Sequence, residues 1–157
     1  MSETNLGAGR PLTLDEANPQ INLGALYVAP DGMRRYRYAK AGSGAALIAG
    51  DLIQAPAEDT GDQNIAGTTT AVGATSITTA SMTVTANQYA GGWVTVTVTP
   101  GLGTTYRIKS HAAYTSAAAT FELEEPITVA LTSTSRLDFA PNPFNGVIQN
   151  PASASAS

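Results

Sequence analysis

The chain has 157 residues and a formal net charge of −4, and only 13% of its residues are charged, against about 25% in an ordinary soluble domain. It has no cysteine and one histidine, His111, which excludes a disulfide framework, a thiolate or multi-histidine metal site and a cysteine nucleophile within one chain. No apolar run approaches the roughly 20 residues of a membrane helix, and the basic residues Arg34, Arg35 and Arg37 are too few to predict nucleic-acid binding. We therefore expect no cofactor, no metal, no membrane and no nucleic acid among its partners.

Residues 1–23 are predicted to form an extended N-terminal arm. Their apolar side chains are separated by glycines and by prolines, and proline fits neither a long helix nor an inner strand. Apolar side chains gain most when they are buried, so we expect the arm to dock on a neighbouring surface; the alternative is a disordered terminus. The candidate interface residues in the arm are Leu6, Leu12, Leu14 and Ile21.

Residues 24–56 are predicted to form a small β unit. A short strand at residues 26–28 is followed by a Pro-Asp-Gly turn at residues 30–32, where proline presets φ and glycine accepts a positive φ. Residues 33–40 then alternate, which places Tyr36 on one face and Arg35 and Arg37 on the other. Tyrosine and arginine are enriched at protein interfaces, although charges on a solvated edge strand also prevent aggregation. The candidate interface residues here are Leu26, Tyr27, Arg35, Tyr36 and Arg37.

Residues 57–149 are predicted to form a β-sandwich or barrel body, followed by a flexible tail at residues 150–157. The body contains a stretch without any carboxylate between Asp62 and Glu122, rich in threonine and valine. Residues 93–99 form its clearest strand, since valines occupy every second position and β-branched residues favour strands. Trp93 lies on the face opposite the valines and is the last candidate interface residue. Further strands are expected at residues 75–79, 82–85, 104–110, 120–124, 127–131, 136–140 and 147–148. The predicted fold class is all-β.

The chain shows no catalytic pattern, and we expect no enzyme. It has no Gly-x-Ser-x-Gly motif, and His111 follows a strand without a nearby nucleophile, so we interpret it as an exposed loop histidine. The acidic run of Glu58, Asp59 and Asp62 offers carboxylates for calcium but lacks the spacing of an EF-hand loop.

Glu122 and Glu124, on the predicted strand at residues 120–124, are explained by charge pairing with a neighbouring strand. If residues 104–110 and 120–124 pair antiparallel, Arg107 and Lys109 can face Glu122 and Glu124. Such exposed cross-strand pairs contribute about 0.2–1 kcal/mol each.

Five motif blocks resemble, in the same order, those of small proteins encoded beside the major capsid protein of tailed phages. The blocks are DGMRRYRYAKA at residues 31–41, ANQYAGGW at 86–93, YRIKS at 106–110, LEEP at 123–126 and PNPFNGV at 141–147. The resemblance implies a head decoration, or cement, protein that binds the outside of the capsid and stabilises the lattice of the major capsid protein. It also implies a location on the outer surface of the virion, with no enzymatic activity and no cofactor.

We also expect the protein to form a homo-oligomer. The core is thin for the chain length, and shared faces would bury more apolar surface. A trimer is the first expectation, by analogy with decoration proteins at three-fold positions, and a dimer is the second.

Two other functions compete with capsid decoration. One is a different virion β module, in a tail fibre, baseplate or pilus-like structure. The other is a carbohydrate-binding module in which Trp93, Tyr89 and Tyr106 form a stacking platform.

Overall fold

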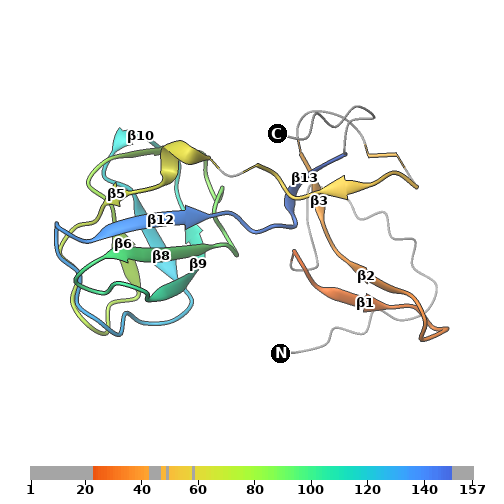
Figure 1. Cartoon of the computed structure of the whole chain (residues 1–157), viewed down its shortest axis with the longest axis horizontal. Helices are drawn as coiled ribbons and strands as arrows, with labels where there is room; N and C mark the ends of the chain where they lie inside the picture. Colours follow the sequence, from red (N-terminus) through yellow and green to blue (C-terminus); the bar gives the residue numbers. More distant parts are fainter. Residues whose placement is uncertain (1–22, 43–46, 49, 58, 150–157) are drawn as a thin grey trace. The chain divides into compact units, whose positions relative to one another are not determined.

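The computed structural model describes residues 23–42, 47–48, 50–57 and 59–149. It is all-β, as predicted, and its secondary structure consists of short strands and one 3₁₀ turn in these residues. The chain divides into two compact units (Figure 1), a larger one of residues 58–142 and a smaller one of residues 1–57 with 143–157. No helix of the described residues is long and apolar enough to cross a membrane.

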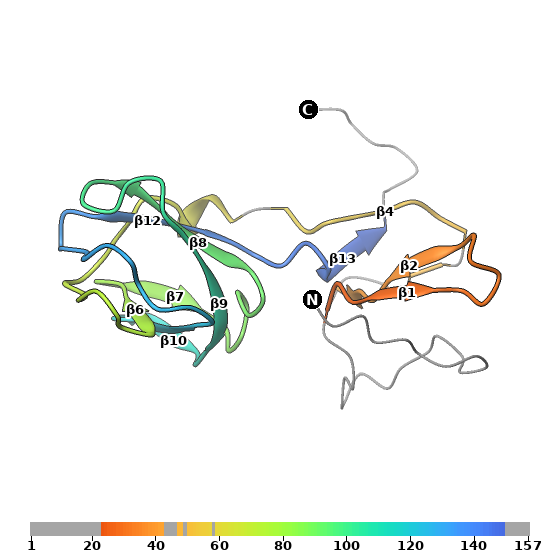
Figure 2. The same ribbon diagram turned by 90° about the horizontal axis from the view of Figure 1, so that it is seen from below.

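The larger unit is built on a six-stranded sheet. Its strands have the order β5 (Ile65–Ala66), β12 (Arg136–Ala140), β8 (Trp93–Val98), β9 (Thr105–His111), β11 (Thr120–Leu123) and β6 (Ser76–Thr78). A second pair joins β7 (Met82–Val84) to β10 (Tyr114–Ala117), and a 3₁₀ turn, η1, spans Thr60–Asp62. The sheet curls, so that β8 and β12 lie across the unit from β6, β7 and β10 (Figure 2).

The inside of this curl is the hydrophobic core. Along β8, Val94 and Val96 are completely buried while Trp93 and Thr95 are half-buried, which confirms the predicted alternation over this part of the strand. Val98, at the end of β8, departs from it and is 42% exposed. Burial of a side chain such as Val94 or Val96 contributes about 1.5–3 kcal/mol. The core cluster consists of Ile77, Met82, Val84, Tyr89, Val94, Val96, Tyr106, Ile108, Ala119, Phe121, Leu123, Ile127, Leu131, Leu137 and Phe139.

Two segments of the larger unit differ from the sequence-based expectation. Residues 127–131 do not form the predicted strand: Ile127 and Leu131 are buried, but only Leu131 makes a bridge, to Thr70. Apolar residues at the ends of a loop therefore gave a strand-like pattern. Conversely, Tyr114–Ala117, which is not among the predicted strands, is strand β10. It carries a bulge opposite β7, with Ser116 at φ 48°, and this irregularity hides the alternation.

The smaller unit combines a hairpin with a three-stranded sheet. The hairpin pairs β1 (Leu26–Val28) with β2 (Arg35–Arg37), and the sheet has the order β3 (Lys40–Ala41), β13 (Asn145–Gln149) and β4 (Ile53–Gln54). Strand β13 runs parallel to β3 and antiparallel to β4. Our expected body of residues 57–149 therefore extended too far. Residues 143–149 belong with the smaller unit, because the strand partners of β13 lie 94 to 106 residues earlier in the chain, beyond the range of any local pattern.

A close approach of two backbones makes Gly92 essential to the larger unit. A Cβ at this position would lie 2.3 Å from the carbonyl oxygen of Ala140, where β8 pairs with β12. We expect Gly92→Ala to lower the free energy of unfolding by about 1–3 kcal/mol, since a backbone atom must shift. Thermal or urea unfolding followed by the fluorescence of Trp93, the single tryptophan, measures this loss.

Gly67→Ala is the matched control for this substitution. Its Cβ would meet Leu137 Cδ1 at 3.5 Å, an ordinary contact, so stability should stay unchanged or rise slightly. Equal destabilisation by both variants would contradict the role given to the β8–β12 contact.

Candidate protein-interaction surface

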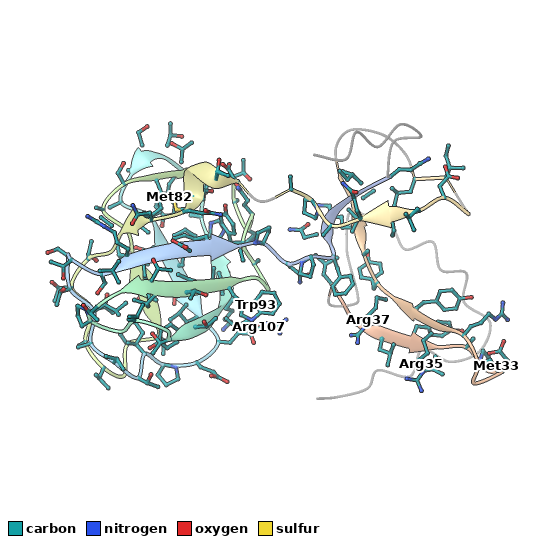
Figure 3. The ribbon with its side chains drawn as sticks, in the orientation of Figure 1. Met33, Arg35, Arg37, Met82, Trp93 and Arg107 are labelled. Atoms are coloured by element: carbon teal, nitrogen blue, oxygen red, sulfur yellow. The ribbon has the colours of Figure 1, made fainter. Side chains whose placement is uncertain are left out.

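The β1–β2 hairpin brings together five of the predicted interface residues. Its register pairs Leu26 with Arg37 and Tyr27 with Tyr36, and Arg35 pairs with Val28. The rings of Tyr27 and Tyr36 stack with their centroids 6.0 Å apart. Figure 3 labels Arg35 and Arg37 along the hairpin and Met33 at its tip.

Strand β2 places Arg35 and Arg37 on the face opposite the stacked tyrosines, as the alternation predicted. Cross-strand partners lie on the same face of a sheet, so Arg35 and Arg37 share a face with Val28 and Leu26. We call these four residues the arginine face. Its two arginines and Val28 are exposed, and Leu26 is half-buried. Cationic and aliphatic groups therefore lie side by side in solvent.

The turn of the hairpin neutralises only one arginine. Asp31 accepts the backbone N–H groups of Met33 and Arg34 and binds Arg34 Nε at 2.8 Å. The Arg34 guanidinium, followed by these backbone donors, lowers the pKa of Asp31. Arg37 donates to the carbonyl oxygen of Gly24 at 2.7 Å. Within the described part of the chain, neither Arg35 nor Arg37 forms an ion pair.

Exposed apolar side chains are concentrated in the smaller unit. Its described residues bury only two hydrophobic side chains, Ala29 and Val147, whereas the whole core cluster belongs to the larger unit. Leu52 and Ile48 are 72% and 63% exposed. The exposed large hydrophobic residues of this unit are Val28, Met33, Tyr36, Leu47, Ile48, Leu52, Ile53 and Ile148.

Sequence reasoning did not select most of these apolar residues. The sequence does contain a signal for an apolar surface here, since residues 47–53 carry two pairs of aliphatic residues around a glycine-aspartate bend. Such short strands cannot form a core of their own.

The remaining predicted interface residues lie elsewhere. Leu6, Leu12, Leu14 and Ile21 fall outside the described residues. Trp93 lies on β8 of the larger unit, whereas the hairpin belongs to the smaller unit.

Trp93 is half-buried, and its outward ring is covered in part by a cation. The guanidinium carbon of Arg107 lies 5.6 Å from the ring centroid of Trp93. Arg107 also binds Glu124 at 3.2 Å, which confirms the predicted pairing of these two charges.

The predicted carbohydrate platform of three aromatic rings is wrong. Tyr89 and Tyr106 are only 1% and 5% exposed, and both belong to the core of the larger unit. The hydroxyl of Tyr106 is bonded to Thr128 Oγ1 at 3.1 Å. Neither ring can therefore stack on a sugar beside Trp93.

The expectation of an exposed loop histidine at position 111 is also wrong. His111 is the last residue of β9 and is 6% exposed. The backbone N–H of Tyr89 donates to His111 Nε2 at 3.0 Å, so the ring proton is on Nδ1, which donates to the carbonyl oxygen of Ala112 at 2.9 Å. Burial lowers the pKa of His111, and the bond to Ala112 opposes this only in part.

Next to the histidine, the core contains a buried acid. Asp62 accepts a hydrogen bond from the hydroxyl of Tyr89. Burial raises the pKa of Asp62, and the Tyr89 hydroxyl partly counteracts that rise. Burial, together with the Asp62 carboxylate, raises the pKa of Tyr89 as well. No local signal reveals this pair, because its members are 27 residues apart.

Two carboxylates of the acidic run considered for calcium accept hydrogen bonds within the larger unit. Asp59 accepts the backbone N–H of Gly61 at 2.9 Å and caps the 3₁₀ turn, while Asp62 binds Tyr89. Glu58 lies outside the described residues. Where side chains are described, no three acidic or histidine groups gather as metal ligands do.

The buried histidine predicts a loss of stability in mild acid. Because its folded-state pKa lies below the ordinary value of 6.5, the unfolded chain binds the proton first. The free energy of unfolding should therefore be constant at and above about pH 7.5 and fall as the pH drops through about 6.5.

His111→Gln removes this titration. We expect its melting temperature, measured between about pH 7.5 and 5.5, to fall less than that of the unmodified protein. Parallel curves for the two proteins would contradict the buried, neutral histidine. Asp62 acts with the opposite sign: its raised pKa makes stability increase as the pH falls through that pKa towards 3.8.

Removal of the Tyr89 hydroxyl should destabilise the larger unit most when Asp62 is ionised. Tyr89→Phe keeps the ring beside Phe139 but takes a donor from the buried carboxylate, at a cost of about 1–3 kcal/mol at pH 7. Denaturant unfolding near about pH 4 should show a smaller loss. Tyr106→Phe, which removes a bond to a neutral threonine, is the control, and its effect should not vary with pH over this range.

Comparison of the chain with protein-family models, with curated proteins and with solved structures gave no match. The comparisons therefore assign the chain to no family.

Proposed function

We propose that this protein is a structural virion protein that decorates the outside of a phage head and stabilises the lattice of the major capsid protein. In this role the smaller unit supplies contact area to the shell, and the larger unit is a folded body with a filled core. The proposal includes self-association, with a trimer first and a dimer second. A role in another virion structure, such as a tail fibre or baseplate, is the alternative.

The uneven distribution of apolar surface is the observation that carries the proposal. Among the described residues, all fifteen members of the core cluster lie in the larger unit, while eight of the twelve exposed large hydrophobic residues lie in the smaller one. Clustered exposed apolar side chains mark interaction surfaces in soluble proteins. A protein that holds a shell together needs such area rather than a reactive centre.

The motif blocks provide separate support. The first block, residues 31–41, runs from the turn of the hairpin through β2 and β3. This block contains Arg35 and Arg37, which form no ion pair with the described residues. Many copies on a symmetric shell would add avidity, so each contact can be weak.

The direct test is binding to purified, expanded empty capsids. The protein should cosediment with the capsids at a fixed stoichiometry and raise the temperature at which they disassemble. Failure of the unmodified protein to bind would refute the proposal. Binding to isolated tail fibres or baseplates instead would favour the alternative.

Two matched pairs of substitutions locate the contact. Ile48 and Leu52 of the smaller unit are 63% and 72% exposed, so replacing both by serine should leave the melting temperature unchanged. If these side chains are buried on the capsid, their loss weakens binding by about tenfold or more.

The control replaces Val72 and Leu102, which are 62% and 61% exposed on the larger unit. Serine at both of these positions should leave capsid binding as it is. Equal weakening by the two pairs would contradict a contact through the smaller unit.

A further inference from the structure

The β1–β2 hairpin is a two-stranded sheet in the described part of the chain, and its hydrogen bonds show which backbone groups face outward. Ala29 N donates to Arg34 O at 2.9 Å, and Tyr38 N donates to Ala25 O at 3.0 Å. Antiparallel strands alternate between hydrogen-bonded and non-bonded pairs, so the bonded pair between these two is Tyr27 with Tyr36. Arg35 and Arg37 fall in non-bonded pairs, and their backbone N–H and C=O groups point away from β1.

Among the described residues, the outer edge of β2 is therefore an open edge. It offers the backbone donors and acceptors of Arg35 and Arg37, which pair with no other described strand. A two-stranded hairpin is marginally stable by itself, and a third strand adds both hydrogen bonds and packing. Strand addition to such an edge is a common mode of peptide recognition.

The side chains at this edge specify the chemistry of the added strand. Arg35 and Arg37 are two residues apart on one face, and this spacing of about 6.5–7 Å matches alternate residues of any extended chain. Neither has a carboxylate partner among the described residues, and a guanidinium binds carboxylates in a bidentate manner. Val28, which lies across from Arg35 on β1, is 41% exposed and adds apolar surface to the same face.

We propose that the outer edge of β2 binds an extended acidic segment of a partner protein by strand addition, with carboxylates at alternate positions opposite Arg35 and Arg37. The inference rests on the proposed function, in that the partner is the major capsid protein. It adds the mode of binding, which is a shared sheet, and the chemistry of the bound segment.

The exposed charges of Arg35 and Arg37 have a second explanation, and the experiments must distinguish it from peptide binding. Charged side chains on an edge strand also prevent unwanted pairing with other chains. In that case no strand adds to β2, and reversal of the charge at Arg35 changes no binding.

The first experiment uses synthetic peptides and the full-length protein. One peptide alternates glutamate with valine, and the control peptide has lysine in place of each glutamate. The glutamate peptide should bind, shift the amide resonances of Arg35 and Arg37, and bind more weakly as salt is raised. Equal binding of both peptides, or no binding of either, would overturn the proposal.

Charge reversal on each unit tests where the peptide binds. Arg35→Glu should weaken binding of the glutamate peptide by at least about tenfold, because like charges would then face each other. Lys109→Glu makes the same change at an exposed position of β9 and should leave the affinity unchanged. Equal loss in both variants would point to the net charge of the protein and overturn the edge site.

A proline substitution tests strand addition itself. Arg35→Pro removes both the charge and the outward N–H, and proline is tolerated on edge strands where the N–H faces solvent. Arg35→Gln removes only the charge, so the proline variant should bind severalfold more weakly than the glutamine variant at equal melting temperature. Equal affinities would mean a contact through side chains alone and would overturn strand addition.

Capsid binding separates this inference from the proposed function. If the unmodified protein and Arg35→Glu bind capsids equally, the edge site fails and the decoration role stands. If the unmodified protein binds no capsid, the decoration role fails, and the peptide titration still decides the edge site. Self-association that disappears in Arg35→Glu would identify a second copy as the occupant and overturn an acidic capsid segment.

Discussion

Alternate burial along β8 is the constraint on which the larger unit depends. Val94 and Val96 face the core from a strand that is paired on both sides, with β12 and with β9. Because cross-strand partners share a face, Val94 fixes the inward direction of Phe139 on one neighbour and of Tyr106 on the other. A slip of one residue would expose every one of these side chains, so one strand sets the register of the central sheet.

The interior that results is not purely apolar, and its polar groups are all occupied. The Asp62–Tyr89–His111 cluster links the 3₁₀ turn, the segment before β8 and the end of β9 by hydrogen bonds. No buried side-chain polar atom of the described residues lacks a partner, as the low dielectric of an interior demands. The smaller unit differs in this respect, because most of its described large hydrophobic side chains are exposed to solvent.

Sequence patterns predicted what depends on neighbours along the chain. The alternating valines predicted β8, the Pro-Asp-Gly turn predicted the hairpin, and the paired charges predicted the contact between Arg107 and Glu124. What depends on distant residues was not predictable. His111 gave no sign of its acceptor role, because its donor is a backbone group 22 residues away, and Tyr89, which lies outside any strand, carries no local mark of burial. The strand β13 has too short a pattern to show that it pairs with β3 and β4.

The pairing of β13 also makes the larger unit an insertion within the smaller one. Residues 58–142 lie in sequence between β4 and the strand that completes its sheet. The pairing of β13 with β4 therefore closes a loop that contains the whole larger unit. Since closing so long a loop is slow and entropically costly, we expect the larger unit to fold first. A folded larger unit replaces this flexible loop by a compact body, which lowers the entropic cost of pairing β13 with β3 and β4.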